Sequence, residues 1–254
     1  CMDGFILTHA YERVDMPEQA QVDQFLPPYE PRQVLDPDEP VTIGAMVGPE
    51  AFAEVRYLAH AKQMQALDLI PQVAEEFRQV FNRDSGGLIK PYRLEDAETI
   101  VIALGSVLGT IKDTVDELRD AGVKIGVLGI TSFRPFPISA IRDATAHAKR
   151  IVVIEKCFAV GIGGIVSRDV RSAVRNRPQP VLTVVAGLGG RAITKASLTK
   201  LLNDAIADKL ELLTFLDLDW DIVNRVLERE KKQRRSGPIA ENILRDLGSA
   251  APGA

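Results

Sequence analysis

The strongest constraint on the fold is a set of short, almost continuously apolar segments that are rich in valine and isoleucine. They are residues 99–104, 124–130, 150–155 and 181–186. Patterns typical of helices follow them, near residues 107–120, 137–148, 163–176 and 194–206. Strands that are apolar on both faces are covered by helices on both faces. The alternation predicts an α/β fold, with an open, mainly parallel sheet and helices on both faces, over about residues 95–210.

The sequence before this predicted domain changes character twice. Residues 1–12 contain a short apolar, strand-like stretch and look like the closing edge of a folded unit. Residues 15–49 are rich in proline, which removes backbone donors and prevents long helices, so we expect an extended connector there. Residues 50–82 have apolar side chains at helical spacing and predict one long helix, with Pro71 as a possible bend.

The sequence after the predicted domain forms a charged tail, residues 211–254. It begins apolar and then predicts a charged helix from about Trp220 to Arg234, and residues 236–238 (Ser-Gly-Pro) end that helix. A last short helix is expected from Ile239 to Leu247. These helices need a surface to lie on, either in their own domain or in another subunit.

Composition and charge exclude several classes of protein. The chain is 46% hydrophobic and 26% charged with a formal net charge of -4, which is ordinary for a globular protein. Mild acidity argues against a nucleic-acid partner, because neutralising phosphates requires a basic face. The sequence has no uninterrupted apolar run of about 18 residues and no signal-peptide pattern at its start, so we expect a cytoplasmic protein without a membrane partner.

The cysteines and histidines are too few and too scattered for a metal centre. Cys1 and Cys157 are the only cysteines and form no CxxC pair, whereas iron–sulfur clusters and structural zinc need about four ligands. His9, His60 and His147 are far apart in sequence. No metal site is expected in this chain alone.

Two motifs suggest ligand binding but fit simpler structures better. Residues 187–192 match G-x-G-x-x-A, a variant of the dinucleotide fingerprint, yet they follow the fourth predicted strand rather than the first. A tight glycine turn is the preferred interpretation. Residues 217–228 carry carboxylates at the spacing of a calcium loop, but Ile222 stands where that loop requires glycine. A helix capped by Asp219 is preferred.

A catalytic apparatus is not visible. Ser106 and Ser132 have no histidine near them in sequence, and the glycines of a nucleophile elbow are missing. Glu155 and Lys156 end the third predicted strand, a suitable position for a ligand or partner, but a charged strand end facing water is the preferred interpretation. We therefore assign no catalytic residue, and the cofactor-binding residues stay undefined.

Several phrases together resemble one enzyme family. They are DGFILTH (residues 3–9), FLPPY (25–29), RPFP (134–137) and GLGGR (187–191), the last followed by Ile193 and Thr194. They occur in the order found in the α subunit of pyruvate:ferredoxin oxidoreductase. The sequence is similar to the C-terminal two-thirds of that subunit, and the resemblance covers essentially the whole chain.

The resemblance implies a division into domains. Residues 1–14 would be the residual C-terminal edge of a truncated pyrimidine-binding, thiamine diphosphate domain. Residues 15–94 would be a proline-rich connector and helical linker, and residues 95–210 an α/β domain like the transketolase C-terminal domain. Residues 211–254 would be a C-terminal helical tail.

The resemblance also implies a reaction and partners. The assembled enzyme would convert a 2-oxoacid, coenzyme A and oxidised ferredoxin into acyl-CoA, carbon dioxide and reduced ferredoxin, with pyruvate as the expected 2-oxoacid. Thiamine diphosphate and magnesium would act in the assembly, with iron–sulfur clusters on partner subunits and no cofactor bound by this chain alone. The partners would be a β subunit, γ and ferredoxin-like δ subunits or equivalent domains, and ferredoxin or flavodoxin.

Candidate interface residues follow from their positions at predicted strand ends. They are Arg134, Phe136, Gly161, Gly163, Gly164 and Arg191. We expect the chain to supply mainly structural and inter-subunit surfaces and to be inactive by itself. Two alternatives stay open: a stand-alone α/β module that binds a coenzyme or nucleotide, and the C-terminal domain of another thiamine diphosphate enzyme.

Overall fold

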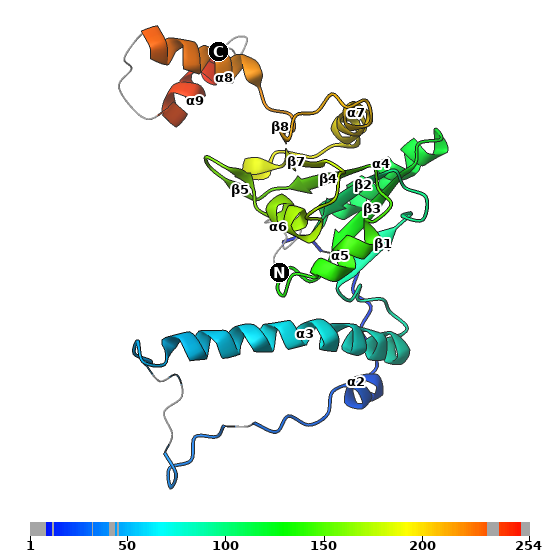
Figure 1. Cartoon of the computed structure of the whole chain (residues 1–254), viewed down its shortest axis with the longest axis vertical. Helices are drawn as coiled ribbons and strands as arrows, with labels where there is room; N and C mark the ends of the chain where they lie inside the picture. The colour runs from blue at the N-terminus through cyan, green and yellow to red at the C-terminus, as the bar shows by residue number, and fades with distance from the viewer. Residues whose placement is uncertain are drawn as a thin grey trace. The chain divides into compact units, whose positions relative to one another are not determined.

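The structure is a computed structural model of the whole chain (Figure 1). It describes residues 9–11, 13–31, 33–40, 44, 46–232 and 239–249. The apolar stretch expected within residues 1–12 lies largely outside the described residues. The chain divides into two compact units, Cys1–Thr214 and Phe215–Ala254, which are described separately.

A mainly parallel sheet forms the centre of the first unit. Within the described residues its strand order is β1-β3-β2-β4-β7-β8. The strands are β1 (Ile89–Tyr92), β2 (Thr99–Ala103), β3 (Ile125–Ile130), β4 (Arg150–Glu155), β7 (Val181–Val185) and β8 (Leu213–Phe215). Val101 of β2 lies in register with Val127 of β3 on one side and Val152 of β4 on the other, and both pairings are parallel. β1 is antiparallel to β3. The predicted open, mainly parallel sheet is confirmed.

Helices cover both faces of this sheet (Figure 1). α4 (Val107–Asp120) packs with α7 (Lys195–Ile206), and α5 (Ile138–Ala144) packs with α6 (Val166–Ala173). Ile100 and Ile102 of β2 join the apolar cluster that contains Ile141 of α5 and Val170 of α6. Because strand side chains alternate, the intervening Val101, fully buried, faces the opposite layer.

The structure adds strands that the sequence patterns do not reveal. β1 contains Pro91 and lies at the edge of the sheet, where proline is tolerated. β5 (Phe158–Ala159) and β6 (Gly163–Gly164) form a small antiparallel hairpin. The hairpin occupies residues that helical spacing assigns to the start of the third helix, so α6 begins only at Val166.

The connector before the sheet contains a short helix beside a long one. α2 (Gln19–Phe25) is short, as the prolines around it require, and α3 (Phe52–Phe81) continues through Pro71. The rings of Phe25, Phe77 and Phe81 form a cluster with centroids 4.6–5.6 Å apart. Gln21 Nε2 also donates to the Val80 carbonyl oxygen at 3.0 Å. These contacts hold α2 against the last turns of α3.

The second unit contains two helices, α8 (Trp220–Lys232) and α9 (Ile239–Ser249), among the residues described. The Asp219 carboxylate accepts the Ile222 backbone N–H at 3.0 Å. This is a helix N-cap, so the capping interpretation of residues 217–228 is confirmed. Arg234, the expected end of the charged helix, lies outside the described part of the chain.

Candidate functional site

The strand order places the usual ligand position of an open α/β sheet between β2 and β4. β3 lies on one side of β2, whereas β4 and β7 lie on the other. The order of the strands therefore reverses between β2 and β4. Ligands of such sheets bind outside the carboxyl ends of the strands at this reversal.

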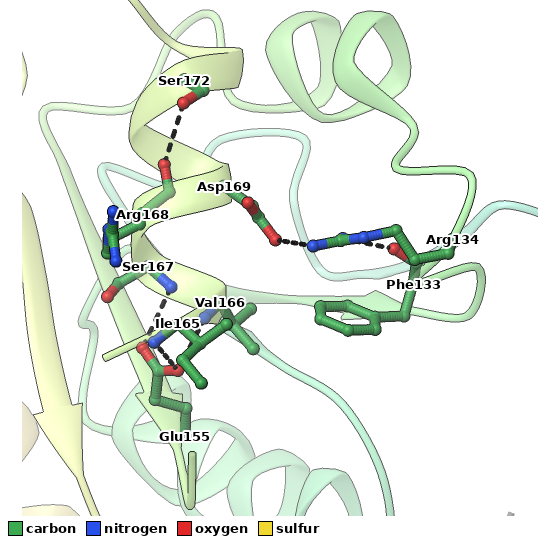
Figure 2. A network of polar contacts seen from close by, with 9 residues as sticks. All are labelled: Phe133, Arg134, Glu155, Ile165, Val166, Ser167, Arg168, Asp169 and Ser172. Carbon is green, nitrogen blue, oxygen red and sulfur yellow. Dashed lines mark hydrogen bonds and ion pairs between the residues drawn. The ribbon is translucent and has the colours of Figure 1, made fainter. Parts of the chain in front are cut away.

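The carboxylate of Glu155 lies at the carboxyl end of β4, one of the two strands at this reversal. Glu155 is the last residue of β4 and is only 6% exposed. Its oxygens accept the backbone N–H groups of Ile165, Val166 and Ser167 at 2.8, 2.7 and 3.0 Å (Figure 2). These donors belong to the start of α6, where backbone N–H groups lack partners within the helix and the helix dipole favours a negative charge. The expectation that Glu155 faces water is wrong.

The glycines of the β5–β6 hairpin shape the chain around this carboxylate. A Cβ atom on Gly164 would overlap the Glu155 carboxylate, so only glycine fits there. Gly163 is buried, has a φ of +107°, and faces the side chain of Leu213. Gly161 is exposed at the turn with a φ of +88°, a conformation that favours glycine. Of these three interface candidates, only Gly161 is at the surface.

A second polar contact joins the loop after β3 to α6. Arg134 donates to the Asp169 carboxylate in an ion pair of 2.8 Å (Figure 2). Its guanidinium carbon lies 4.1 Å from the centroid of the Phe133 ring. Phe136 is half-buried and packs against the apolar core, so it has a structural role in this chain. Ser132 Oγ donates to the Pro135 carbonyl oxygen at 3.0 Å and stabilises the same loop.

Arg191 belongs to a separate loop after β7. This loop contains a short 3-10 helix, Leu188–Gly190, and Arg191 is exposed beyond it. The strands β2 and β4 lie between β3, which precedes Arg134, and β7. The structure therefore brings Arg134 close to α6 and the Glu155 region, and it places Arg191 at a different point along the same sheet edge.

Arg171 of α6 is a half-buried cation that binds the neighbouring strand β7. It donates to Thr183 Oγ1 at 2.7 Å and to the Val181 carbonyl oxygen at 2.8 Å. Burial lowers the pKa of Arg171, and the charge of Glu155 acts in the opposite direction. Arg171 is thus held by its hydrogen bonds to β7.

Among the described residues, no group of three or more histidine, cysteine, aspartate or glutamate side chains gathers where it could hold a metal ion. The Glu155 carboxylate at the end of β4 already accepts three hydrogen bonds. The Glu155 carboxylate is therefore a buried structural group, and the loops that follow the strands are exposed around it.

Comparison with known proteins identifies the region. Residues 97–198 match the family model described as pyruvate:ferredoxin oxidoreductase core domain II. Residues 1–75 match the model described as pyruvate flavodoxin/ferredoxin oxidoreductase, thiamine diP-bdg. This region of the chain belongs to the pyruvate:ferredoxin oxidoreductase family.

Curated relatives in this family are oxidoreductase subunits. The pyruvate synthase subunit PorA of Methanosarcina barkeri is 44% identical over 80% of this chain and 52% of its own length. The ketoisovalerate oxidoreductase subunit VorA of Pyrococcus horikoshii is 36% identical over 75% of this chain and 49% of its own length. The chain spans about half the length of these relatives.

A solved structure of a 2-oxoglutarate:ferredoxin oxidoreductase from Magnetococcus marinus, with 2-oxoglutarate, coenzyme A and succinyl-CoA bound, aligns with a TM-score of 0.39. The alignment has 21% identity and covers 54% of this chain and 24% of that chain.

Sequence reasoning missed that Glu155 is buried and binds the start of α6, although the sequence contains a signal for this role. An acidic residue ends an apolar strand, and a glycine pair stands just before the next helix. The pair leaves room for the carboxylate to reach the first N–H groups of that helix. Asp169 carries no such signal, because its contact with Arg134 joins segments 35 residues apart.

Proposed function

We propose that this chain is part of the α subunit of a thiamine diphosphate-dependent 2-oxoacid:ferredoxin oxidoreductase. The assembled enzyme converts pyruvate, coenzyme A and oxidised ferredoxin into acetyl-CoA, carbon dioxide and reduced ferredoxin. The observation that carries the proposal is that two models of this family match along one chain, at residues 1–75 and 97–198. Pyruvate is favoured over a branched 2-oxoacid because identity to the PorA relative exceeds identity to the VorA relative.

The described residues do not fit thiamine diphosphate as a complete site. A diphosphate with its magnesium ion needs carboxylate ligands or free helix N-termini. The α6 N-terminus is filled by Glu155, and the described residues contain no cluster of potential metal ligands. We assign the diphosphate and magnesium to the β subunit and the iron–sulfur clusters to partner subunits.

The role of this chain is then structural and inter-subunit. Residues 1–14 form the edge of a pyrimidine-binding domain, residues 15–94 a connector, residues 95–210 the α/β domain, and residues 211–254 a helical tail. Arg134, Phe136, Gly161, Gly163, Gly164 and Arg191 mark the interface with the β subunit. Phe136 and the two buried glycines act through the shape that they give to their loops. Further partners are γ and ferredoxin-like δ subunits and ferredoxin or flavodoxin, in the cytoplasm. No described helix is long and apolar enough to cross a membrane.

Activity of the assembled complex tests this proposal. The full α subunit that contains this sequence is co-expressed with candidate β, γ and δ subunits, and ferredoxin reduction is followed spectroscopically. We expect reduction that requires both pyruvate and coenzyme A and is faster than with 2-oxoisovalerate. A complex that assembles but fails to reduce ferredoxin with any 2-oxoacid tested would contradict the proposal.

A stand-alone coenzyme-binding module is the second candidate, because residues 187–192 retain the G-x-G-x-x-A pattern. Glu155 argues against it, since its carboxylate already accepts the N–H groups at the start of α6, where a nucleotide phosphate would bind. Binding of NAD or coenzyme A by the chain alone would favour this candidate. A third candidate is the C-terminal domain of another thiamine diphosphate enzyme, which needs no ferredoxin. The ferredoxin-reduction assay of the assembled complex distinguishes it from the proposed function.

A further inference from the structure

The two edges of the sheet carry different kinds of charge. Four segments follow the parallel strands at their carboxyl ends: residues 104–106, 131–137, 156–165 and 186–194. Together we call them the carboxyl edge. Their charged side chains are Arg134, Lys156 and Arg191, and they contain no aspartate or glutamate. This is notable because acidic residues outnumber basic ones in the whole chain, 35 to 31.

The opposite, amino edge is covered by ion pairs within the chain. Glu98 lies 2.7 Å from Lys149, and Asp96 lies 2.8 Å from Arg119. These partners lower the pKa values of Glu98 and Asp96, first through hydrogen bonds from Lys149 and Arg119. Charges of both signs therefore neutralise one another at the amino edge. At the carboxyl edge, Arg134 pairs with Asp169, which belongs to α6 and not to the edge itself.

The carboxyl edge also exposes apolar side chains. The exposed ones are Leu104, Phe133, Val160, Ile162, Ile165 and Leu188. Val160, at the tip of the β5–β6 hairpin, is 89% exposed, and Ile162 is 61% exposed. Small-molecule sites enclose most of the ligand in a concavity. A valine that projects almost fully into solvent fits a protein surface better than such a pocket.

The hairpin is held in one conformation before any partner arrives. Phe158 pairs with Gly164 and Ala159 with Gly163. Gly164 packs directly on the Glu155 carboxylate, which is itself bound to the first N–H groups of α6. Because the loop is already ordered, docking would lose little conformational entropy.

We propose that the carboxyl edge docks a partner subunit whose contact surface is apolar at its centre and carries aspartate or glutamate side chains around it. This inference rests on the proposed function and specifies the chemistry of the partner. The cations at this edge complement the carboxylates of the partner. The projecting Val160 and Ile162 contact its apolar centre, where the removal of water from both surfaces favours binding.

Zero-length cross-linking of the purified complex tests the contact directly. A carbodiimide joins a lysine amine to a carboxylate within salt-bridge distance, and Lys156 is the lysine within the carboxyl edge. We expect mass spectrometry to find Lys156 joined to an aspartate or glutamate of another subunit. An intact, active complex in which Lys156 is freely acetylated and forms no such link would overturn the inference but leave the proposed function standing.

Variants measure the energetic contribution of the edge. Val160→Asp and Lys156→Glu are compared with Lys124→Glu, a 59% exposed lysine at the amino edge. We expect the dissociation constant for the partner subunit to rise about tenfold for each carboxyl-edge variant, as for a central interface residue. Added salt should weaken the wild-type complex and reduce the effect of Lys156→Glu. Lys124→Glu should leave the affinity unchanged.

Two controls distinguish a lost contact from a misfolded variant. Circular dichroism and thermal melting establish that each variant is folded, and Lys156→Gln replaces Lys156→Glu if reversal disturbs the neighbouring Glu155. Unchanged affinity in folded carboxyl-edge variants would overturn the inference. So would competition between the partner and coenzyme A at this edge, because the edge would then be a coenzyme site. Failure of any subunit to associate with the wild-type chain would contradict the proposed function itself.

Discussion

At the scale of single residues, Glu155 and Gly164 form a close pair between the end of β4 and the start of α6. One supplies a buried negative charge, and the other supplies the space that this charge needs. The sequence places Glu155 at the end of a strand and Gly164 in the turn that follows it. It does not identify their contact, because the preferred position for a carboxylate is in water and only the three-dimensional path of the hairpin shows otherwise.

Glu155→Gln tests the importance of the charge. The amide keeps the size of the side chain but places N–H donors against the N–H groups of α6 and removes charge-assisted hydrogen bonds. We expect the free energy of unfolding to fall by about 2 kcal/mol in urea titrations. Glu98→Gln, at the exposed amino edge, should lower it much less, because solvent screens the charge of Glu98. Equal effects of the two substitutions would show that the buried carboxylate has no special role.

Replacing two glycines by alanine should change stability in opposite directions. A Cβ at Gly164 would overlap the Glu155 carboxylate, so Gly164→Ala should destabilise the domain by about 1–3 kcal/mol. Gly109 lies inside α4 with open space around its Cβ position, so Gly109→Ala should stabilise by about 0.5–1 kcal/mol. Thermal melting measures both. A stable Gly164→Ala protein would contradict the assigned position of the carboxylate.

At the scale of elements, regular periodicity made the central strands and helices predictable. β4 spans Arg150–Glu155 as the apolar run requires, and α7 begins one residue after its cap, Thr194, whose hydroxyl accepts the Ser197 N–H at 3.1 Å. The elements that were missed have no periodicity to show. The hairpin strands contain two residues each, and β1 is an edge strand of four residues. Tertiary pairing rather than local pattern determines these elements.

The association of α2 with α3 depends on a small number of contacts. Neither helix has a buried residue, so the ring cluster of Phe25, Phe77 and Phe81 accounts for much of their packing. Phe77→Ala should therefore increase hydrogen–deuterium exchange across residues 19–25. Tyr57→Ala, on the same helix at 69% exposure, should leave exchange there unchanged. Unaltered protection in the Phe77→Ala protein would show that other contacts hold α2.

At the scale of the whole molecule, the sequence predicted the α/β class because apolar strands and amphipathic helices alternate along the chain. The candidate surface residues were located at strand ends by the same reasoning. Whether each was exposed could not be predicted, because exposure depends on neighbours distant in sequence: Phe136 packs on the core, whereas Arg134 lies at the surface with Asp169. The difference in charge between the two sheet edges likewise emerges only after the strands are ordered.

The amino edge should make the molecule sensitive to acid. The pKa values of Asp96 and Glu98 are lowered in the folded chain by their hydrogen bonds to Arg119 and Lys149. A lowered folded pKa contributes stability above the unfolded value, about 4 for these groups, and this contribution is lost as the pH falls toward the folded value. The Asp96→Asn, Glu98→Gln double variant should therefore lose less stability than the wild-type chain between about pH 5 and about pH 3. An unchanged pH profile would contradict this account.

The central claim is that this chain works through its surfaces in an α subunit and does not bind a coenzyme by itself. Calorimetric titration of the purified chain, first with the β subunit and then separately with NAD and coenzyme A, tests it most directly. We predict saturable heat with the β subunit and none with either coenzyme. Saturable binding of NAD or coenzyme A, with no binding of the β subunit, would contradict the claim.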